Sequence, residues 1–195
     1  MKNCIFNAHC TEPICDKACP VLVESSYLLE RNELALDNPV FNASPKDINK
    51  VLKIIHSKPN GLCTVISDNT IYMSNLLTYC AICENWQGNR LHCNVYHLKF
   101  SNYIDAIQHS WSVKDTPEHL EYEQIWINSA KVLIISNLDF VQFKDFQAQT
   151  LLNIIHNRAN SQLLTIIVCP KLQSLVGSGL FYKRLQSMLE EVIVR

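Results

Sequence analysis

The stretch Lys131–Cys169 constrains the fold of this chain more than any other. It begins with an apolar run, Val132–Ile135, that stops at the polar residues Ser136 and Asn137. A segment of helical periodicity follows, and then a second apolar run, Leu163–Val168. Strand, helix and strand within about 40 residues form the βαβ unit of a parallel α/β sheet. Ligands of such sheets bind at the carboxyl ends of the strands, so Ser136 and Asn137 are the first candidate site residues.

The rest of the chain repeats this alternation. Helical periodicity or helix-start signals mark the intervening segments, which are 21–31, 45–57, 76–86, 101–111, 116–130 and 180–189. Apolar runs or alternating patterns predict the other strands, which are Leu62–Ile66, Leu91–Leu98 and Glu190–Arg195. The sequence therefore predicts an α/β core of five strands with alternating helices.

The composition fits a cytoplasmic globular protein. With 195 residues, 48% of them hydrophobic, the chain can bury one sizeable core beside a small appendage. A net charge of −1 gives no overall attraction to nucleic acid or to a membrane surface. The N-terminus has no apolar signal segment, and no apolar run approaches the ~20 residues of a membrane span. We expect the 9 cysteines to be reduced in the cytoplasm.

A cluster of four cysteines opens the chain: Cys4, Cys10, Cys15 and Cys19. Thiolates are soft ligands that suit zinc or iron–sulfur iron. The cluster contains no Cys-x-x-Cys pair, which weakens a zinc-ribbon interpretation, and its end resembles bacterial iron–sulfur motifs. We predict a metal site, with a slight preference for a 4Fe-4S cluster over zinc. His9 is interpreted as a neighbour and not a ligand, and unligated thiols are the alternative.

The cysteine cluster defines the predicted domain division. Residues 1–43 form a Cys-rich metal-binding region that ends in a linker, Asn32–Ala43. Residues 44–195 form the α/β domain. Ser44 and Pro45 provide an N-cap and an N1 proline for its first helix.

The segment after Leu62–Ile66 occupies the position of a P-loop. That motif requires glycine at its first and sixth positions, lysine at its seventh, and serine or threonine at its eighth. We expect an eight-residue loop with Ser67, Tyr72, Met73 and Ser74 at those positions, and only Ser74 matches. Without the glycines the backbone cannot readily turn its N–H groups toward phosphate, and methionine supplies no cation. The sequence predicts a degenerate nucleotide site and no ATP binding.

Two further groups of polar or sulfur side chains are interpreted as structural. Cys80 and Cys83 lie within one predicted helix, and we expect core thiols more than a redox pair. Four histidines follow no metal-ligand spacing and are expected at the surface or at an interface: His92, His97, His109 and His119.

Four segments, VLIISN, QTLLNIIHNRANSQLLTIIVCP, KLQSLVGSG and FYKRL, follow one another in the second half of the chain. Through the order of these four segments, the chain from Gly61 onward resembles the AAA+ ATPase core of bacterial helicase loaders and transposition helper ATPases, which form the DnaC/IstB-like group. The resemblance implies a five-stranded parallel, P-loop NTPase-like core of three layers. In that family the first segment ends in an acidic pair, the second carries a sensor residue, and the Arg before Leu is an arginine finger.

The chain departs from this family at its catalytic positions. Ser136 and Asn137 stand where the resemblance implies the Mg²⁺-binding and water-activating carboxylates, and neither can act as a general base. Asp139 is displaced along the chain, and Cys169 or its neighbour occupies the sensor region. Together with the degenerate P-loop, these changes predict a pseudo-ATPase. Arg184 matches the arginine finger, which acts in trans on nucleotide held by an adjacent subunit.

Two functions from different classes follow. The first is a catalytically inactive, loader-like assembly or adaptor protein that binds a replication or mobile-element partner, such as a helicase or an active AAA+ ATPase. The alternative is an iron–sulfur redox or DNA-associated sensor on a P-loop-like scaffold. A working ATPase requires Asp68, Glu84 or Asp139 to replace the missing groups. DNA contact stays an open alternative. A modest basic patch is predicted, and acidic neighbours dilute its charge. The residues of the patch are Lys171, Lys183, Arg184 and Arg195.

Overall fold

The computed structural model describes the chain except for residues 1–19, 36–37, 58–59, 86–93, 113–117 and 195. Its helices are α1 (Pro20–Arg31), α2 (Pro45–Ser57), α3 (Thr70–Asn85), α4 (Phe100–Ser110), α5 (Glu118–Ser129), α6 (Asp145–Asn160) and α7 (Leu180–Glu191). Its strands are β1 (Leu62–Ile66), β2 (Val95–Lys99), β3 (Val132–Ser136), β4 (Leu164–Cys169) and β5 (Ile193–Val194). Short 3-10 turns are η1 (Pro39–Asn42), η2 (Leu138–Phe140) and η3 (Leu172–Ser174).

The strands form one parallel sheet in the order β2-β3-β4-β1-β5. The βαβ unit expected from the sequence pairs β3 with β4, from Val132 opposite Leu164 to Ile135 opposite Ile167. β1 inserts on the other side of β4, although the two strands lie far apart in the sequence. The prediction of a five-stranded parallel α/β sheet is confirmed.

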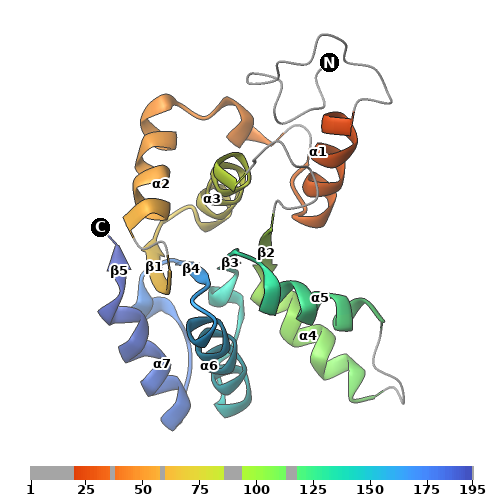
Figure 1. Cartoon of the computed structure of the whole chain (residues 1–195). Helices are drawn as coiled ribbons and strands as arrows, with labels where there is room; N and C mark the ends of the chain where they lie inside the picture. The colour runs from red at the N-terminus through yellow and green to blue at the C-terminus, as the bar shows by residue number, and fades with distance from the viewer. Residues whose placement is uncertain (1–19, 36–37, 58–59, 86–93, 113–117, 195) are drawn as a thin grey trace.

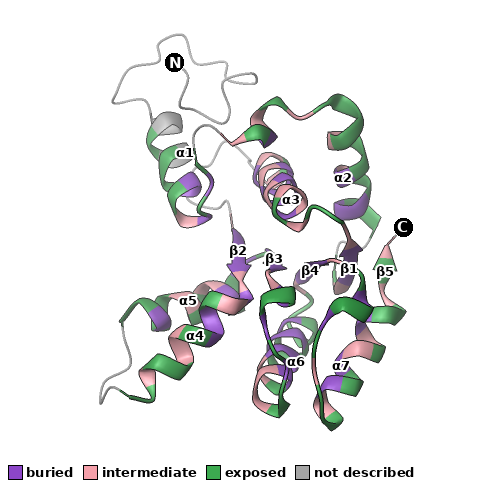
Figure 2. Cartoon of the chain, turned by 180° about the vertical axis from the view of Figure 1, so that it is seen from behind, coloured by how far each residue is buried: buried purple, intermediate pink, exposed green. Residues whose placement is uncertain are grey.

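Two layers of helices cover the sheet and give a three-layer architecture (Figure 1). Helices α1, α2 and α3 pack on one face, and α4, α5, α6 and α7 pack on the other. Along β3, Val132 and Ile134 face the first layer, whereas Leu133 and Ile135 face the second. Because both faces are covered, the inner strands are mainly apolar and do not alternate with polar residues. Figure 2 shows the buried residues gathered where the helices meet the sheet.

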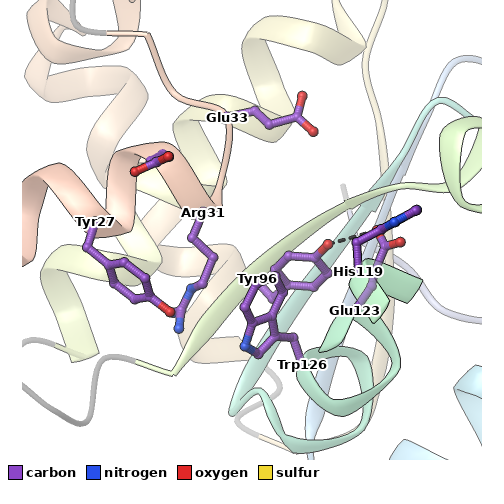
Figure 3. Close-up of a pocket in the computed structure, with 8 residues that line it drawn as sticks. Tyr27, Arg31, Glu33, Tyr96, His119, Glu123 and Trp126 are labelled. Atoms are coloured by element: carbon purple, nitrogen blue, oxygen red, sulfur yellow. Dashed lines mark hydrogen bonds between the residues drawn. The ribbon is translucent and has the colours of Figure 1, made fainter. Parts of the chain in front are cut away.

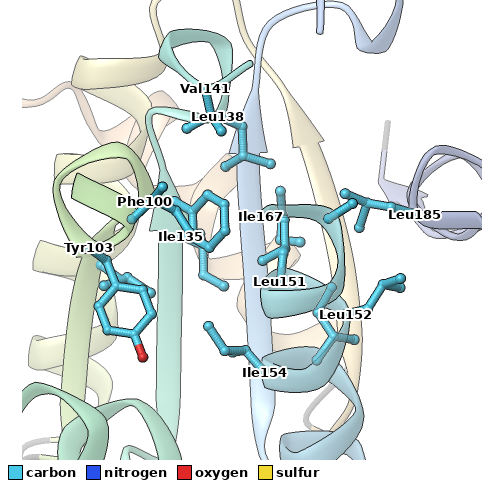
Figure 4. Packing of buried hydrophobic residues seen from close by; sticks show 14 of the residues in the cluster. Phe100, Tyr103, Ile135, Leu138, Val141, Leu151, Leu152, Ile154, Ile167 and Leu185 are labelled. Carbon is cyan, nitrogen blue, oxygen red and sulfur yellow. The ribbon is translucent and has the colours of Figure 1, made fainter. Parts of the chain in front are cut away.

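The larger core lies between the sheet and the layer of α4–α7. Ile135 of β3 and Ile167 of β4 are fully buried there, beneath Leu151 of α6 (Figure 4). Phe100 extends the same core toward Phe143, with ring centroids 6.0 Å apart. Each such side chain stabilises the fold by roughly 1.5–3 kcal/mol through burial. This core holds the carboxyl ends of β3 and β4 in place.

Local signals explain where several elements begin. The Ser44 hydroxyl accepts a hydrogen bond from the Asp47 backbone N–H at 3.2 Å, which caps α2 as the sequence indicated. Gly61 has φ 112°, a conformation that favours glycine, and it turns the chain into β1. The strand predicted at 91–98 begins later, since β2 spans Val95–Lys99 and residues 86–93 lie outside the described residues.

Residues 20–43 share the core of the α/β domain. Leu28, Leu29, Leu34 and Val40 are buried in one cluster with α2 and α3, and η1 lies within the predicted linker. The division between 1–43 and 44–195 stays a prediction for the cysteine segment, because residues 1–19 lie outside the described residues. The described part of the N-terminal region is part of the first helical layer.

The end of α1 covers the outer edge of β2, and we call this set of contacts the edge clasp. Arg31 Nη2 donates to the Val95 carbonyl at 2.9 Å, and Asn32 Oδ1 accepts from the His97 backbone N–H at 2.9 Å. Lys99 Nζ forms an ion pair with Glu33. These contacts satisfy polar groups of an edge strand that would otherwise be open to another chain.

Arg158 is a fully buried arginine on α6. Its guanidinium donates to the Thr165 hydroxyl at 2.9 Å and to the carbonyls of Ile127 and Leu164 at 2.6 Å. Burial lowers the pKa of Arg158 to about 10, which leaves it charged at neutral pH. The side chain therefore ties α5, α6 and β4 together.

Candidate functional site

The connection between β1 and α3 is shorter than expected. Only Ser67, Asp68 and Asn69 separate the strand from the helix, so the predicted eight-residue loop is wrong. Asn69 Oδ1 accepts a hydrogen bond from the Tyr72 backbone N–H at 3.0 Å, and the Asn69 N–H donates to Ser67 Oγ at 3.3 Å. An asparagine cap of this kind starts the helix early. Residues 70–74 are therefore helical and do not form a phosphate-binding loop.

The three P-loop positions within α3 turn toward the protein. Tyr72 and Met73 are partly buried and pack against the core of the first helical layer. Ser74 is only 1% exposed, and its hydroxyl donates to the Ile71 carbonyl at 3.1 Å. The one residue that matches the P-loop pattern thus has its hydroxyl engaged within its own helix.

The position of the expected acidic pair is occupied by a buried hydrogen bond. Ser136 Oγ, at the end of β3, lies 2.8 Å from His97 Nε2 on β2. Burial lowers the pKa of His97 to about 3, and the charge of Lys99 adds to this, so the imidazole is neutral. Asn137 follows with φ 61°, a left-handed conformation that asparagine tolerates well. His97 was expected at the surface or at an interface and is buried within the protein, because the edge clasp and α3 cover this part of β2.

Cys169 lies at the end of β4 and belongs to the core on the α4–α7 face of the sheet, where Asp139 is close enough to act on it electrostatically. The Cys169 thiol is fully buried, and burial raises its pKa to about 12, with a further contribution from the negative charge of Asp139. A protonated buried thiol is a poor nucleophile and a poor metal ligand. Asp139 itself is exposed in η2, after the strand and not at its end.

A cavity of about 580 Å³ adjoins the degenerate site. Met73 forms part of its wall, together with Val65 and Ile66 of β1. Lys50 and Lys53 of α2 stand at its rim. Its lining is mainly apolar, and the lysine expected on α3 is replaced by the methionine.

Arg184 is exposed on α7, next to the exposed Lys183. The opposite side of this helix is buried through Tyr182, Leu185 and Leu189. Lys171 is exposed in the segment after β4, and Arg195 lies outside the described residues. Arg184 is thus accessible, as an arginine that acts on a neighbouring subunit must be.

The predicted metal ligands Cys4, Cys10, Cys15 and Cys19 lie outside the described residues. Within the described part of the chain, no group of three potential His, Cys, Asp or Glu ligands is found. Cys80 is buried and Cys83 partly buried, and burial raises their pKa values to about 12 and about 11. Both are protonated core thiols at neutral pH, as the sequence indicated. No described helix has the length and apolar character to cross a membrane.

Sequence reasoning missed a second pocket at the edge of β2. It is lined by residues of α1, β2 and α5 and by Glu33, which follows α1: Tyr27, Glu30, Arg31, Glu33, Tyr96, His119, Glu123 and Trp126. The signal was present as helical spacing, since Tyr27 and Arg31 lie four residues apart and His119, Glu123 and Trp126 share one face of α5. No local sequence pattern indicates that these two helix faces meet.

No protein-family model and no curated protein matches the sequence. Among solved structures, a DNA replication initiation factor matches with a TM-score of 0.56 and 14% identity, covering 85% of this chain and 46% of that chain. AMPPCP-bound DnaA from Aquifex aeolicus matches with a TM-score of 0.57 and 11% identity, covering 80% of this chain and 48% of that chain. This chain thus spans about half the length of both proteins. The chain thus shares the fold of these two proteins, a five-stranded parallel sheet between two layers of helices.

Proposed function

We propose that this protein is a catalytically inactive, AAA+-like assembly or adaptor protein that binds a protein partner in DNA replication or in the movement of a mobile element. The observation that carries this proposal is the β1–α3 connection. A P-loop presents unpaired backbone N–H groups and a lysine to phosphate. Here Asn69 caps the helix, Ser74 donates inward and Met73 joins an apolar wall.

The carboxyl end of β3 supports the same conclusion. Magnesium in nucleotide sites is held by carboxylates, and hydrolysis requires a group that orients or activates water. Ser136 is engaged by His97, and neither side chain is a carboxylate. Metal-assisted phosphoryl transfer has no support at this position.

The assembly role is supported by an exposed arginine that the chain retains at the position of the family's arginine finger. Arg184 is exposed and matches the arginine finger of the helicase-loader group, so it is a candidate for completing a nucleotide site in an adjacent AAA+ subunit. The four N-terminal cysteines would hold zinc or a 4Fe-4S cluster and stabilise a docking region. The two structural neighbours include a DNA replication initiation factor, which favours a partner in replication.

The decisive test of the inactive site is isothermal titration of the purified protein with ATP and Mg²⁺. We expect no heat of binding at micromolar ATP. Micromolar affinity for ATP would overturn the proposal. Loss of that affinity in Asp68→Asn or Asp139→Asn would then assign the working ATPase to those carboxylates.

The partner and the metal are tested on one sample. Affinity purification under anaerobic conditions, followed by mass spectrometry and metal analysis, is expected to yield an AAA+ ATPase or helicase together with one bound metal centre. Zinc with no visible colour contradicts the iron–sulfur sensor. Broad visible absorption that changes on reduction, with no protein partner, favours that sensor over the adaptor.

A further inference from the structure

The pocket beside β2, which we call the edge pocket, has a volume of about 430 Å³. It lies where the end of α1 and the face of α5 meet at the outer strand of the sheet. Its size is within the range of sites that take a small molecule or one large side chain. The degenerate nucleotide site does not contribute to it.

Aromatic rings form much of its lining. Tyr96 and Trp126 lie with ring centroids 5.4 Å apart, and Tyr27 faces them from α1 (Figure 3). The Arg31 guanidinium stands 5.5 Å from the Tyr27 ring centroid and 6.0 Å from that of Trp126. Ring faces at such distances attract cations. The edge pocket is therefore lined by groups that already hold one guanidinium.

Carboxylates surround this lining on several sides. Glu30 lies on α1, Glu33 follows that helix, and Glu123 lies on α5. Glu123 accepts a hydrogen bond from Tyr96 Oη at 2.8 Å. Within the described part of the chain, neither Glu30 nor Glu123 has a Lys or Arg ion-pair partner, whereas Glu33 pairs with Lys99.

The negative charges oppose one another across the pocket. Burial raises the pKa of Glu123, the hydrogen bond from Tyr96 and the charge of His119 lower it, and the negative charge of Glu33 adds a smaller rise. Two carboxylates that repel each other in a partly desolvated site gain from a cation placed between them. The same charges disfavour phosphate groups, so nucleic acid is a poor ligand for this surface.

We propose that the edge pocket binds an arginine side chain of a protein partner, with its guanidinium over the Tyr96 and Trp126 rings and its N–H groups on Glu30 and Glu123. This inference rests on the proposed adaptor function and specifies the chemistry of the partner. Arginine fits better than lysine, because its planar guanidinium stacks on rings and reaches two carboxylates together.

The first experiment is a titration of the full chain with a capped glycine peptide that contains one arginine. The comparison ligand is the same peptide with citrulline, which has nearly the same shape and no charge. We expect millimolar or tighter binding of the arginine peptide and about tenfold weaker binding of the citrulline peptide. Absence of binding, or equal affinity for both peptides, overturns the inference.

A matched pair of variants locates the site. In Glu123→Gln the amide oxygen can still accept from Tyr96 Oη, so the local structure is kept while the charge is lost. We expect about fivefold weaker arginine binding in this variant. Glu121→Gln removes the same charge from an exposed position of α5 outside the edge pocket and is expected to leave the affinity unchanged. Equal losses in both variants would show a nonspecific charge effect and overturn the site.

Failure of this inference differs from failure of the proposed function. If the protein binds no ATP and retains its partner when Glu123→Gln is introduced, the adaptor function stands and the edge pocket is not its docking site. If ATP binds with micromolar affinity, the adaptor function fails whatever the peptides show.

Discussion

The degenerate nucleotide site and the edge pocket treat their polar groups in opposite ways. At the degenerate site, Ser136 forms a hydrogen bond with His97, Asn69 caps α3, and Ser74 donates to a carbonyl of its own helix, so that only His97 Nδ1 lacks a partner among the buried polar atoms of these side chains. At the edge pocket, Glu123 faces a cavity with a hydrogen bond from Tyr96 and no ion pair to Lys or Arg among the described residues, and Arg31 and His119 line the same cavity.

This difference separates a structural region from a binding region. A buried polar group that has its partner within the protein stabilises the fold and offers little to a ligand. A partly desolvated charge without a countercharge costs free energy, and a ligand that supplies the countercharge recovers part of it. We propose on this basis that the ends of β1 and β3 are structural in this chain, whereas the outer edge of β2 is a binding surface.

The largest expected effect is the loss of strand β3, which supports both the degenerate site and the edge pocket. Ile135→Asp places a charge at a fully buried position of β3, the strand that ends at Ser136 and pairs with β2. We expect a loss of about 4 kcal/mol or more, enough to unfold the chain or nearly so. Urea denaturation measures it, with the exposed Ile125→Asp as the control. A soluble Ile135→Asp variant that unfolds cooperatively at nearly the original urea concentration would show that β3 is not the central support.

A smaller effect tests whether the degenerate site is structural. In the unfolded chain, His97 becomes protonated as the pH falls below its ordinary pKa of 6.5. In the folded protein, it stays neutral until the pH falls to its lowered pKa of about 3. Stability from this residue is thus present above pH 6.5 and is lost as the pH falls toward 3. Between pH 7 and pH 5 we expect a loss of about 2 kcal/mol that is absent in His97→Gln.

Urea denaturation at the two pH values measures the His97 contribution. His109→Gln is the matched control, because His109 is exposed on α4 and its replacement removes one histidine without touching the buried pair. The same pH dependence in His97→Gln as in the unmodified protein would contradict the buried neutral imidazole.

The smallest expected effect concerns repair of the nucleotide site. Met73→Lys restores the P-loop lysine, yet we expect no measurable ATP affinity by isothermal titration. The reason is that Asn69 still caps α3 and Ser74 still donates to Ile71, so the backbone presents no phosphate cradle. Micromolar ATP binding by this variant would mean that the site needs only the cation, and the contrast with the edge pocket would weaken.

The sequence predicted the elements well where local signals act alone. β1 matches its predicted range because Gly61 turns the chain before an apolar run, and α2 begins where Ser44 provides a cap. The parallel sheet followed from the βαβ pattern around β3 and β4. The strand order was not determined by this local pattern, since β1 reaches β4 through long-range pairing.

The site was harder to predict because the conformation of its residues depends on which hydrogen-bond partners they find in the folded protein. Ser67–Ser74 was interpreted as a loop from the P-loop spacing, and the Asn69 cap decided the outcome locally. An arginine in the last turn of a helix, such as Arg158, is usually exposed. Only the tertiary structure brings together the three buried acceptors of its guanidinium. The edge pocket requires two helix faces to meet at β2, which no local pattern specifies.

The edge clasp has a consequence for how this chain can be shortened. Cutting at the predicted boundary after residue 43 would remove Asn32 and Glu33 from β2 together with Leu28, Leu29, Leu34 and Val40 from the core. A bare outer strand with unpaired backbone groups is a template for pairing between molecules. A fragment of residues 44–195 is therefore expected to form aggregates during expression, whereas a fragment that begins at Pro20 keeps its outer strand protected.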